Sequence, residues 1–301
     1  MAKELWTHTP SEALRFRSGA KVSEIDTDSS PGFKGKRKDA EKITLDREAH
    51  FAELQEMLYA NAREGDHRSV LLVLQGMDTA GKGGIVTHVV AAGNPMGIDY
   101  HSFGKPTPEE RSHHFLWRIN KSLPPAGHIG VFDRSHYEDV LVVRVHELVP
   151  SDELEGRYDE INTFEQELVE AGTSIVKVAM FVSLDEQKAR LTERLQRPDK
   201  FWKYNPGDLD ERALWPKYQE AYQVMLERTS TDHAPWFILP CDKKWYARMA
   251  VNELLIEALT AMNLSWPPAD FDLEAERARV AALSTTRTVR GCARKGSARP
   301  R

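Results

Sequence analysis

The chain contains little cysteine, no long apolar run and no excess of positive charge, and each absence excludes a class of protein. Cys241 and Cys292 are its two cysteines among 301 residues, too few for a disulfide framework or a cysteine-based metal site. No apolar stretch approaches the roughly 20 residues that a membrane-spanning helix needs. The net charge of −5 at pH 7 gives no general reason to expect nucleic-acid binding.

The first ten residues, which include Lys3, Glu4 and His8, lack the apolar stretch of a secretory signal peptide. The histidines show no spacing typical of zinc ligands. With 41% hydrophobic and 29% charged residues, the composition is that of a globular protein with a full core. We therefore expect a cytoplasmic protein that acts without a membrane.

A glycine-rich segment after an apolar run is the strongest functional signal. The run Val70–Leu74 ends close to Gly76, and four residues separate Gly76 from the pair Gly81-Lys82. This spacing is typical of a phosphate-binding loop between a buried strand and a helix. In such a loop the backbone N–H groups and the helix N-terminus face a phosphate, and a lysine adds a mobile positive charge.

The loop departs from the usual pattern at two positions. Gly83 follows the lysine where a serine or threonine hydroxyl would bind magnesium, and Asp78 stands inside the loop. A carboxylate beside bound phosphates repels them unless a cation lies between. We favour Asp78 as a magnesium ligand, and a solvent-exposed turn residue is the alternative.

Apolar runs that alternate with helical patterns predict a parallel α/β sheet, with ligands at the carboxyl ends of the strands. We expect strands at 70–74, 130–133, 174–184 and 236–239, and helices at 82–92, 185–197 and 245–262. Asp46 and Thr107 are expected to cap two further helices, the second through a capping box. Residues 134–148 fit two patterns: valines 140, 142, 143 and 145 favour a strand, whereas Tyr137, Leu141, Val145 and Leu148 have helical spacing. The sequence does not decide between a strand and a helix there.

Composition divides the chain into three parts. Residues 1–40 are polar and are expected to form an extended or loosely packed arm. Residues 41–268 contain the alternating strands and helices, with a lid around 190–210. Residues 269–301 form a C-terminal extension, and its basic end from residue 285 lacks apolar periodicity, which predicts disorder.

Charged residues follow the expected strand at 130–133. Asp133 ends the strand, which in a chain with a phosphate loop is where magnesium is held or an acceptor is activated; a simple strand-end aspartate is the alternative. Arg134 can form a forked contact with phosphate oxygens. Glu138 is typical of a solvated position, with a part in the metal shell as the other interpretation.

Basic residues gather after the strand at 174–184. Arg190, Arg194 and Arg197 share one face of the expected helix, and Lys200 and Lys203 follow. One interpretation is a lid whose arginines stabilise charge during phosphoryl transfer. The other is a solvated helix face, which we favour for Arg190.

Together these motifs resemble the polyphosphate kinase 2 family, the polyphosphate:nucleotide phosphotransferases, over residues 40–265. The matching positions are Gly76, Asp78, Gly81, Lys82, Gly83 and Gly84 in the loop, Asp133, Arg134, Ser135 and Tyr137 after the strand, Phe103, Pro106 and Thr107 on the nucleotide side, and Arg194, Arg197, Lys200, Trp202 and Lys203 in the lid.

The resemblance implies a P-loop kinase-like three-layer sandwich: a parallel five-stranded sheet with helices on both faces and a helical lid. It implies reversible, magnesium-dependent transfer of a terminal phosphoryl group between inorganic polyphosphate and nucleoside mono- or diphosphates. Manganese is expected to substitute for magnesium. The run at 134–141 is similar to the group that accepts both AMP and ADP. Adenine nucleotides are the expected acceptors, guanine nucleotides are further candidates, and a homo-oligomer, dimer or tetramer, is expected.

The resemblance also implies residue roles. Asp78 and Asp133 would hold magnesium and, with Lys82, Arg134 and Arg194, would carry catalysis. The phosphate-binding set would be Gly76, Ala80, Gly81, Lys82, Gly83, Gly84, Arg197, Lys200 and Lys203. The nucleotide-binding set would be Phe103, Pro106, Thr107, Arg134 and Glu138.

Two other functions use part of the same pattern. Asp133-Arg134-Ser135 after a strand is also similar to relatives of thymidylate kinase, which suggests an ATP-dependent nucleoside or nucleoside-monophosphate kinase. The glycine at position 83 and the long basic lid argue against it. A non-catalytic nucleotide-binding switch would need the loop but not the basic residues of the lid.

Overall fold

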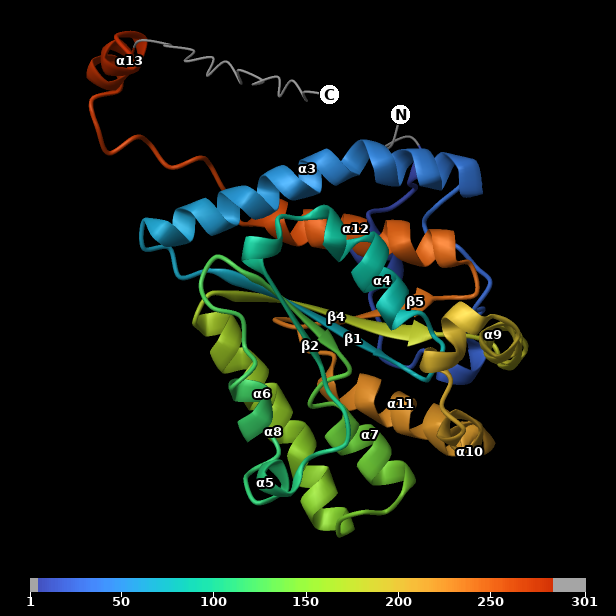
Figure 1. The fold of residues 1–301 in the computed structure, drawn as a ribbon. Coiled ribbons are helices and arrows are strands. Elements are labelled where there is room, and N and C mark those ends of the chain that lie inside the picture. Colours follow the sequence, from blue (N-terminus) through green and yellow to red (C-terminus); the bar gives the residue numbers. More distant parts are fainter. Residues whose placement is uncertain (1–4, 284–301) are drawn as a thin grey trace, which may run out of the picture. The chain divides into compact units, whose positions relative to one another are not determined.

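Strand β1 (Ser69–Gly76) occupies the centre of a five-stranded sheet with the order β2-β3-β1-β4-β5 (Figure 1). The other strands are β2 (Ile98–Ser102), β3 (Ile129–Asp133), β4 (Thr173–Phe181) and β5 (Trp236–Pro240), and all neighbours pair in parallel. Every residue of β1 is buried, because helices cover both faces of a parallel sheet. The computed structural model describes residues 5–283.

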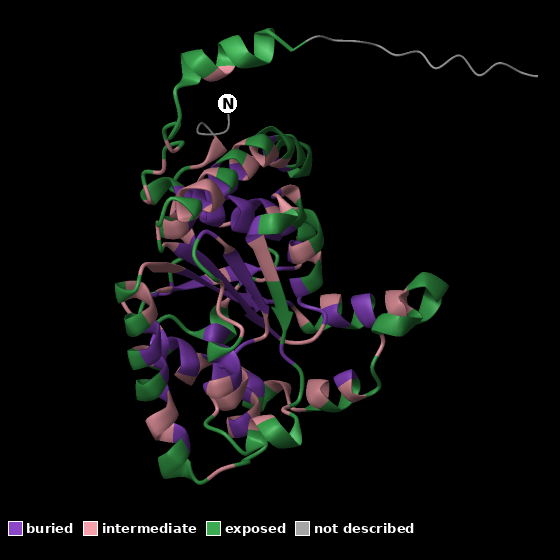
Figure 2. Ribbon diagram, turned by 60° about the vertical axis from the view of Figure 1, so that its left-hand side comes forward, coloured by how far each residue is buried: buried purple, intermediate pink, exposed green. Residues whose placement is uncertain are grey.

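Alternate residues of β1 enter two separate apolar cores. Leu72 and Leu74 pack in a core with α3 (Arg37–Arg63), α4 (Lys82–His88) and α12 (Lys244–Ala261). Leu71 and Val73 pack in the other core with α6 (Trp117–Asn120), α7 (Glu138–Val145), α8 (Ser151–Glu170) and α11 (Trp215–Thr229). Figure 2 shows the buried sheet between two helical layers that contain both buried and exposed residues. The predicted three-layer α/β fold is confirmed.

Further helices and 3-10 turns complete the described part of the chain. They are α2 (Pro10–Leu14), α5 (Pro108–Arg111), α9 (Leu184–Gln196), α10 (Gly207–Ala213) and α13 (Leu273–Ala281), with 3-10 turns η1 (Val22–Glu24), η2 (Val90–Ala92), η3 (Pro95–Gly97) and η4 (Pro198–Lys203). The chain divides into two units, residues 1–266 and residues 267–301; within the described part of the second, α13 is capped by Asp272. The predicted disorder from residue 285 concerns residues outside those that the structure describes. No described helix has the length and apolar character needed to cross a membrane.

The expectation of a loosely packed arm at residues 1–40 is wrong. Leu14, Phe16 and Phe33 are buried, and the backbone N–H of Phe16 donates to the carbonyl of Trp236 at 2.8 Å. The apolar residues of the arm are few, but most of them are buried in, or packed against, one of the two cores. The polar composition of residues 1–40 therefore did not indicate that this segment packs on the sheet.

The structure also corrects the start of one helix and decides the ambiguous stretch. The helix expected after Asp46 begins at Arg37, where the carboxylate of Asp39 accepts from the backbone N–H of Lys36 at 2.8 Å. The ambiguous stretch 134–148 contains helix α7, because Val140, Val143 and Val145 pack into a core from this helix rather than pairing in the sheet. The capping box at Thr107 is present.

Candidate active site

The predicted phosphate loop joins β1 to α4 at the carboxyl edge of the sheet. Gly76 packs so closely that a Cβ there would lie 2.8 Å from the carbonyl oxygen of Met180. Gly81 has a φ of +118°, which favours glycine. A Cβ at Gly83 would meet no atom within 4 Å, so packing does not explain that glycine. The open space beside it leaves the start of α4 accessible to an anion.

Lys82 lies across the base of the loop. Its ammonium donates to the carbonyl oxygen of Gly76 at 2.6 Å and to that of Met77 at 3.4 Å, and its side chain is buried. A lysine has three donors, so one remains available for a phosphate oxygen. The structure therefore holds this positive charge within the loop.

An ion pair joins the loop to the end of β3. Nη2 of Arg134 donates to Oδ1 of Asp78 at 2.6 Å, which excludes the interpretation of Asp78 as a freely solvated turn residue. Burial raises the pKa of Asp78, but the charges of Lys82 and Arg134 outweigh burial and hold that pKa below its usual range. Arg134 also has a φ of +65°, a strained conformation that is concentrated at functional sites.

Asp133 lies beside this ion pair. It pairs in register with Leu74 near the end of β1, and its Oδ2 accepts from the hydroxyl of Tyr100 at 3.3 Å. Within residues 5–283 no three His, Cys, Asp or Glu side chains gather as a metal site. Magnesium commonly takes one or two carboxylates and completes its shell with phosphate oxygens and water. Asp78 and Asp133, at neighbouring strand ends, fit such a partial donor set.

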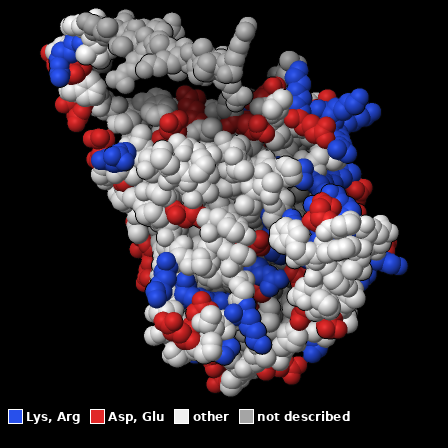
Figure 3. All heavy atoms as spheres, viewed as in Figure 1, with Lys and Arg blue, Asp and Glu red and all other residues white. Residues whose placement is uncertain are grey.

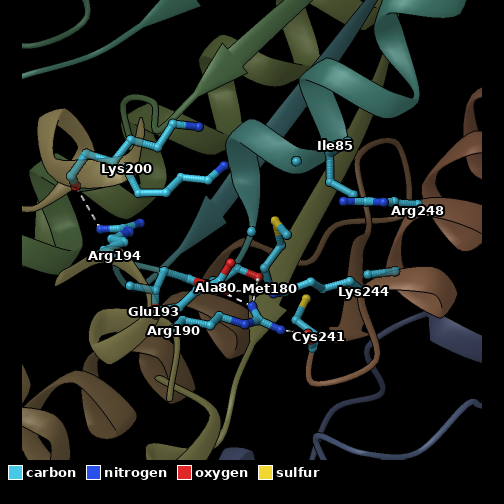
Figure 4. A pocket seen from close by; sticks show the side chains of 15 residues that line it. Ala80, Ile85, Met180, Arg190, Glu193, Arg194, Lys200, Cys241, Lys244 and Arg248 are labelled. Carbon is cyan, nitrogen blue, oxygen red and sulfur yellow. Dashed lines mark hydrogen bonds and ion pairs between the residues drawn. The ribbon is translucent and has the colours of Figure 1, made fainter. Parts of the chain in front are cut away.

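A small basic cavity opens on one side of the loop. It has a volume of about 190 Å³ and is bordered by Ala80, Gly81 and Gly84 of the loop. Its basic residues are Arg190, Arg194, Lys200, Lys203, Lys244 and Arg248 (Figure 4). Figure 3 shows blue Lys and Arg atoms in the hollow between the sheet layers and the α9–α10 segment. We call this space the basic cavity.

A larger cavity of about 860 Å³ opens on the other side of the loop, bordered by Gly76 and Asp78. Its lining mixes both charges with apolar side chains and includes Pro106, Arg118, Arg134, Glu138, Asp139, Leu141, Tyr218 and Tyr222. Glu138 accepts a hydrogen bond from the amide of Gln75 on β1. We call this space the mixed cavity.

Lys82, Gly83 and Asp133 border neither cavity; the first two belong to the loop and α4, and the third ends β3. Three further predicted site residues also lie away from the cavities. Arg197 is about half exposed and pairs with Glu193 and Asp199, and it does not line the basic cavity. Phe103 is buried against Phe132, with ring centroids 4.9 Å apart, and does not line the mixed cavity. The third, at position 107, uses its hydroxyl to cap α5.

The predicted lid residues Arg194, Lys200 and Lys203 do line the basic cavity. Nη1 of Arg194 donates to Oδ2 of Asp208 at 3.1 Å and to the carbonyl of Lys203 at 3.0 Å. Arg194 therefore ties α9 to both η4 and α10.

Sequence reasoning missed several residues of the site. Lys244 and Arg248 border the basic cavity from α12, and their spacing of four at the start of a helix could have indicated a shared face. Arg118 borders the mixed cavity and donates to the carbonyl of Gly104 at 2.9 Å. Burial raises the pKa of Asp139, which pairs with Arg118. No local pattern marks Arg118, whereas Asp139 stands directly after Glu138 in the charged run that follows Asp133.

The solvated position favoured for Arg190 is wrong. Arg190 is 7% exposed and donates to the loop carbonyls of Thr79 at 2.8 Å and Ala80 at 3.0 Å. Spacing placed it on one helix face with Arg194 but could not indicate that this face packs against the loop.

Comparison with known proteins agrees with the geometry. The profile of the family Polyphosphate kinase 2 (PPK2) matches residues 34–267. The AMP/ADP-polyphosphate phosphotransferase of Meiothermus ruber is 42% identical over 246 residues, which cover 82% of this chain and 91% of that protein. The ADP-polyphosphate phosphotransferase of Rhodopseudomonas palustris is 42% identical over 228 residues, or 72% of this chain and 78% of that protein.

A solved structure supports the same assignment. The crystal structure of Polyphosphate Kinase 2 from Arthrobacter aurescens TC1 superposes with a TM-score of 0.89 at 52% sequence identity and covers 92% of this chain and 98% of that one. The family match includes the phosphate loop, the strand-end aspartate and the basic residues of α9 and η4. The chain therefore belongs to the polyphosphate kinase 2 family.

Proposed function

We propose that this protein transfers a terminal phosphoryl group, reversibly, between inorganic polyphosphate and adenine nucleotides, and that AMP and ADP both serve as acceptors. The observation that carries this proposal is the pair of cavities that border the phosphate loop. The basic cavity suits a chain of phosphates, and the mixed cavity suits a molecule that also has a base and a sugar. The relative from Meiothermus ruber has the name of an AMP/ADP-polyphosphate phosphotransferase.

The reaction needs alignment and charge neutralisation more than covalent chemistry. An oxygen of the acceptor phosphate attacks the terminal phosphorus of polyphosphate, the bridging P–O bond breaks, and the shortened polyphosphate leaves with the bond electrons on its oxygen. We expect Lys82, Arg134 and Arg194 to stabilise charge on the transferring group. In support, Lys82 is held within the loop, and Arg134 and Arg194 border the two cavities. No covalent intermediate on the protein is required.

Magnesium is part of the proposal, with manganese as a substitute. Asp78 and Asp133 would hold the ion, and when bound it would neutralise phosphate charge between the two substrates. In the structure Arg134 already neutralises Asp78. Arg134 must therefore share or release this carboxylate when the ion binds.

Further parts of the proposal rest on the family resemblance. We infer that the protein is cytoplasmic, forms a homo-oligomer (dimer or tetramer), and accepts guanine nucleotides as well as adenine nucleotides. An ATP-dependent nucleoside or nucleoside-monophosphate kinase is not favoured. A three-phosphate donor would leave the outer basic residues, such as Lys200 and Lys203, without a role.

A product assay tests the proposal. Purified protein with magnesium and polyphosphate is given AMP, ADP, GMP or GDP, and ATP replaces polyphosphate in control reactions. We expect ADP and ATP from AMP, and ATP from ADP, only with polyphosphate as the donor. Phosphorylation of a nucleoside or monophosphate by ATP alone, with polyphosphate inert, would refute the proposal and support the ATP-dependent alternative.

A further inference from the structure

One face of α9 binds three consecutive carbonyl groups of the phosphate loop. Nε2 of Gln187 donates to the carbonyl oxygen of Asp78 at 3.1 Å. Nη1 of Arg190 donates to the carbonyl oxygens of Thr79 at 2.8 Å and Ala80 at 3.0 Å. Both side chains are buried, at 1% and 7% exposure. Figure 4 shows Arg190 reaching Ala80 from the α9 side. We call Gln187 and Arg190 the carbonyl clamp.

The rest of the Arg190 guanidinium is fully engaged. Its Nη2 donates to the carbonyl oxygens of Cys241 at 2.5 Å and Asp242 at 3.3 Å, and its Nε donates to Glu186 at 2.7 Å. A guanidinium has five N–H donors, and these contacts account for all of them. Arg190 therefore has no donor left for a phosphate and cannot act as a direct ligand in this arrangement.

Fixing a carbonyl also fixes the N–H of the same peptide group. A trans peptide is planar, and its N–H points opposite to its C=O. Because the clamp holds the carbonyls of Thr79 and Ala80 toward α9, the N–H groups of Ala80 and Gly81 point away from α9. The N–H of Ala80 is used within the turn, where it donates to Met77 at 3.1 Å. The N–H of Gly81 is thus directed away from the clamp.

The loop needs such support because its backbone is strained. Thr79 has a φ of +67°, and a β-branched residue is rarely found in this left-handed region. Such conformations persist only where the surroundings over-determine them. The clamp binds the carbonyl of Asp78, which precedes the Thr79 nitrogen, and the carbonyl of Thr79 itself. The peptide groups on both sides of the strained Thr79 Cα are therefore held in place. The clamp supplies that over-determination directly.

We propose that Gln187 and Arg190 are positioning residues that hold the phosphate loop in its anion-binding conformation. The proposal deepens the proposed function, because it takes polyphosphate as the ligand of this loop. It implies that α9 has two roles: its first turns position the loop, while Arg194 farther along faces the basic cavity. Since the clamp acts through geometry, its loss weakens phosphate binding in a way that salt does not screen.

Two substitutions test the clamp, with one matched control. Arg190→Lys keeps the positive charge but cannot fork between carbonyls, and Gln187→Met keeps the length but removes the donor. Lys188→Met removes a charge from an exposed position on the same helix, with no loop contact. The measurements are the melting temperature, kcat, the KM for each substrate at low and high salt, and calorimetric binding of inorganic triphosphate.

For both clamp variants we expect folded protein with a KM for polyphosphate raised at least about tenfold, the scale of a lost hydrogen bond to a charged group. The KM for the nucleotide should change less than about twofold, because the clamp positions the loop that binds polyphosphate. The ratio of the variant's KM for polyphosphate to that of the wild type should not depend on salt. Lys188→Met should match the wild type. A wild-type KM for polyphosphate in folded Gln187→Met would overturn the clamp, as would equal increases in both KM values that follow the loss of melting temperature.

The triphosphate measurement separates this inference from the proposed function. If wild-type protein binds triphosphate but does not use polyphosphate, the proposed function fails while the clamp is still tested by the triphosphate affinity of the variants. If the variants then bind triphosphate as tightly as wild type, the clamp fails too. If wild-type protein binds neither anion, both proposals are wrong.

Discussion

A buried ion pair between β4 and α8 offers the sharpest test of how this fold is held together. Lys177 and Glu165 are 0% exposed, and their Nζ and Oε2 atoms lie 2.6 Å apart. Nζ of Lys177 also donates to the hydroxyl of Tyr137 at 2.8 Å and to the carbonyl of Thr229 at 2.7 Å. Nε2 of His136 lies 3.2 Å from Glu165. The ion pair therefore anchors the segment that directly follows Arg134.

Lys177→Met removes the cation and leaves the carboxylate of Glu165 buried and uncompensated. Breaking a buried ion pair in this way costs about 3–5 kcal/mol. At about 2–4 °C per kcal/mol for a domain of this size, the melting temperature should fall by about 6–20 °C. The double variant Lys177→Met with Glu165→Gln removes both charges and should recover part of the loss, because replacing a whole buried pair is often close to neutral.

Denaturant unfolding and thermal scans of the wild type, both single variants and the double variant form a double-mutant cycle. The expected interaction energy is favourable, and each single variant is less stable than the double variant. The matched control is Lys217→Met, which removes an exposed lysine paired with Glu147 at 3.4 Å and should change stability by less than about 1 kcal/mol. A Lys177→Met protein as stable as the control would refute the reasoning.

The other predictions concern the site. Lys82→Met and Asp133→Asn should each lower kcat at least about a hundredfold without loss of melting temperature, and a wild-type rate in folded Asp133→Asn would sink its assignment. Asp78→Asn should raise the magnesium concentration for half-maximal rate. The folded-state pKa of Asp78 is lowered, so the ionised carboxylate stabilises the fold above about pH 4, and this contribution is lost as the pH falls through the lowered pKa. Asp78→Asn should therefore lose less stability than the wild type in an acid titration. The double variant Lys200→Ala with Lys203→Ala should raise the KM for polyphosphate far more than that for nucleotide, and added salt should shrink the effect; equal KM changes would contradict it.

Much of the sheet could be predicted from the sequence because burial on both faces leaves an unbroken apolar run. The run at 70–74 belongs to the central strand β1, and Asp133 marks the end of β3. Strand β2 could not be found in this way. It lies at the edge of the sheet and is partly exposed, with Tyr100 at 50% exposure, so it has no buried apolar run to detect.

The site was predicted best where chemistry depends on neighbours in sequence. Gly76 and Lys82 are close in sequence, and the ammonium of Lys82 donates to the carbonyl of Gly76. The loop can therefore be recognised from local spacing without any distant contact. Arg190 was misread because its partners, Thr79 and Cys241, lie far from it in sequence. Spacing on a helix tells which residues share a face, whereas only the tertiary fold decides what that face meets.

The difference between the two cavities suits the two substrates that we propose. Polyphosphate presents only phosphate groups, and under the proposal it would bind in the small cavity lined by charges such as Arg194 and Lys244. A nucleotide also presents a base and a sugar, which need apolar surface and paired polar groups, and the mixed cavity is about 860 Å³ against 190 Å³ for the basic cavity. The phosphate loop borders both. Because the carbonyls of Thr79 and Ala80 are tied toward α9, the same short segment can be rigid on its protein side and open on the side where the two substrates would meet.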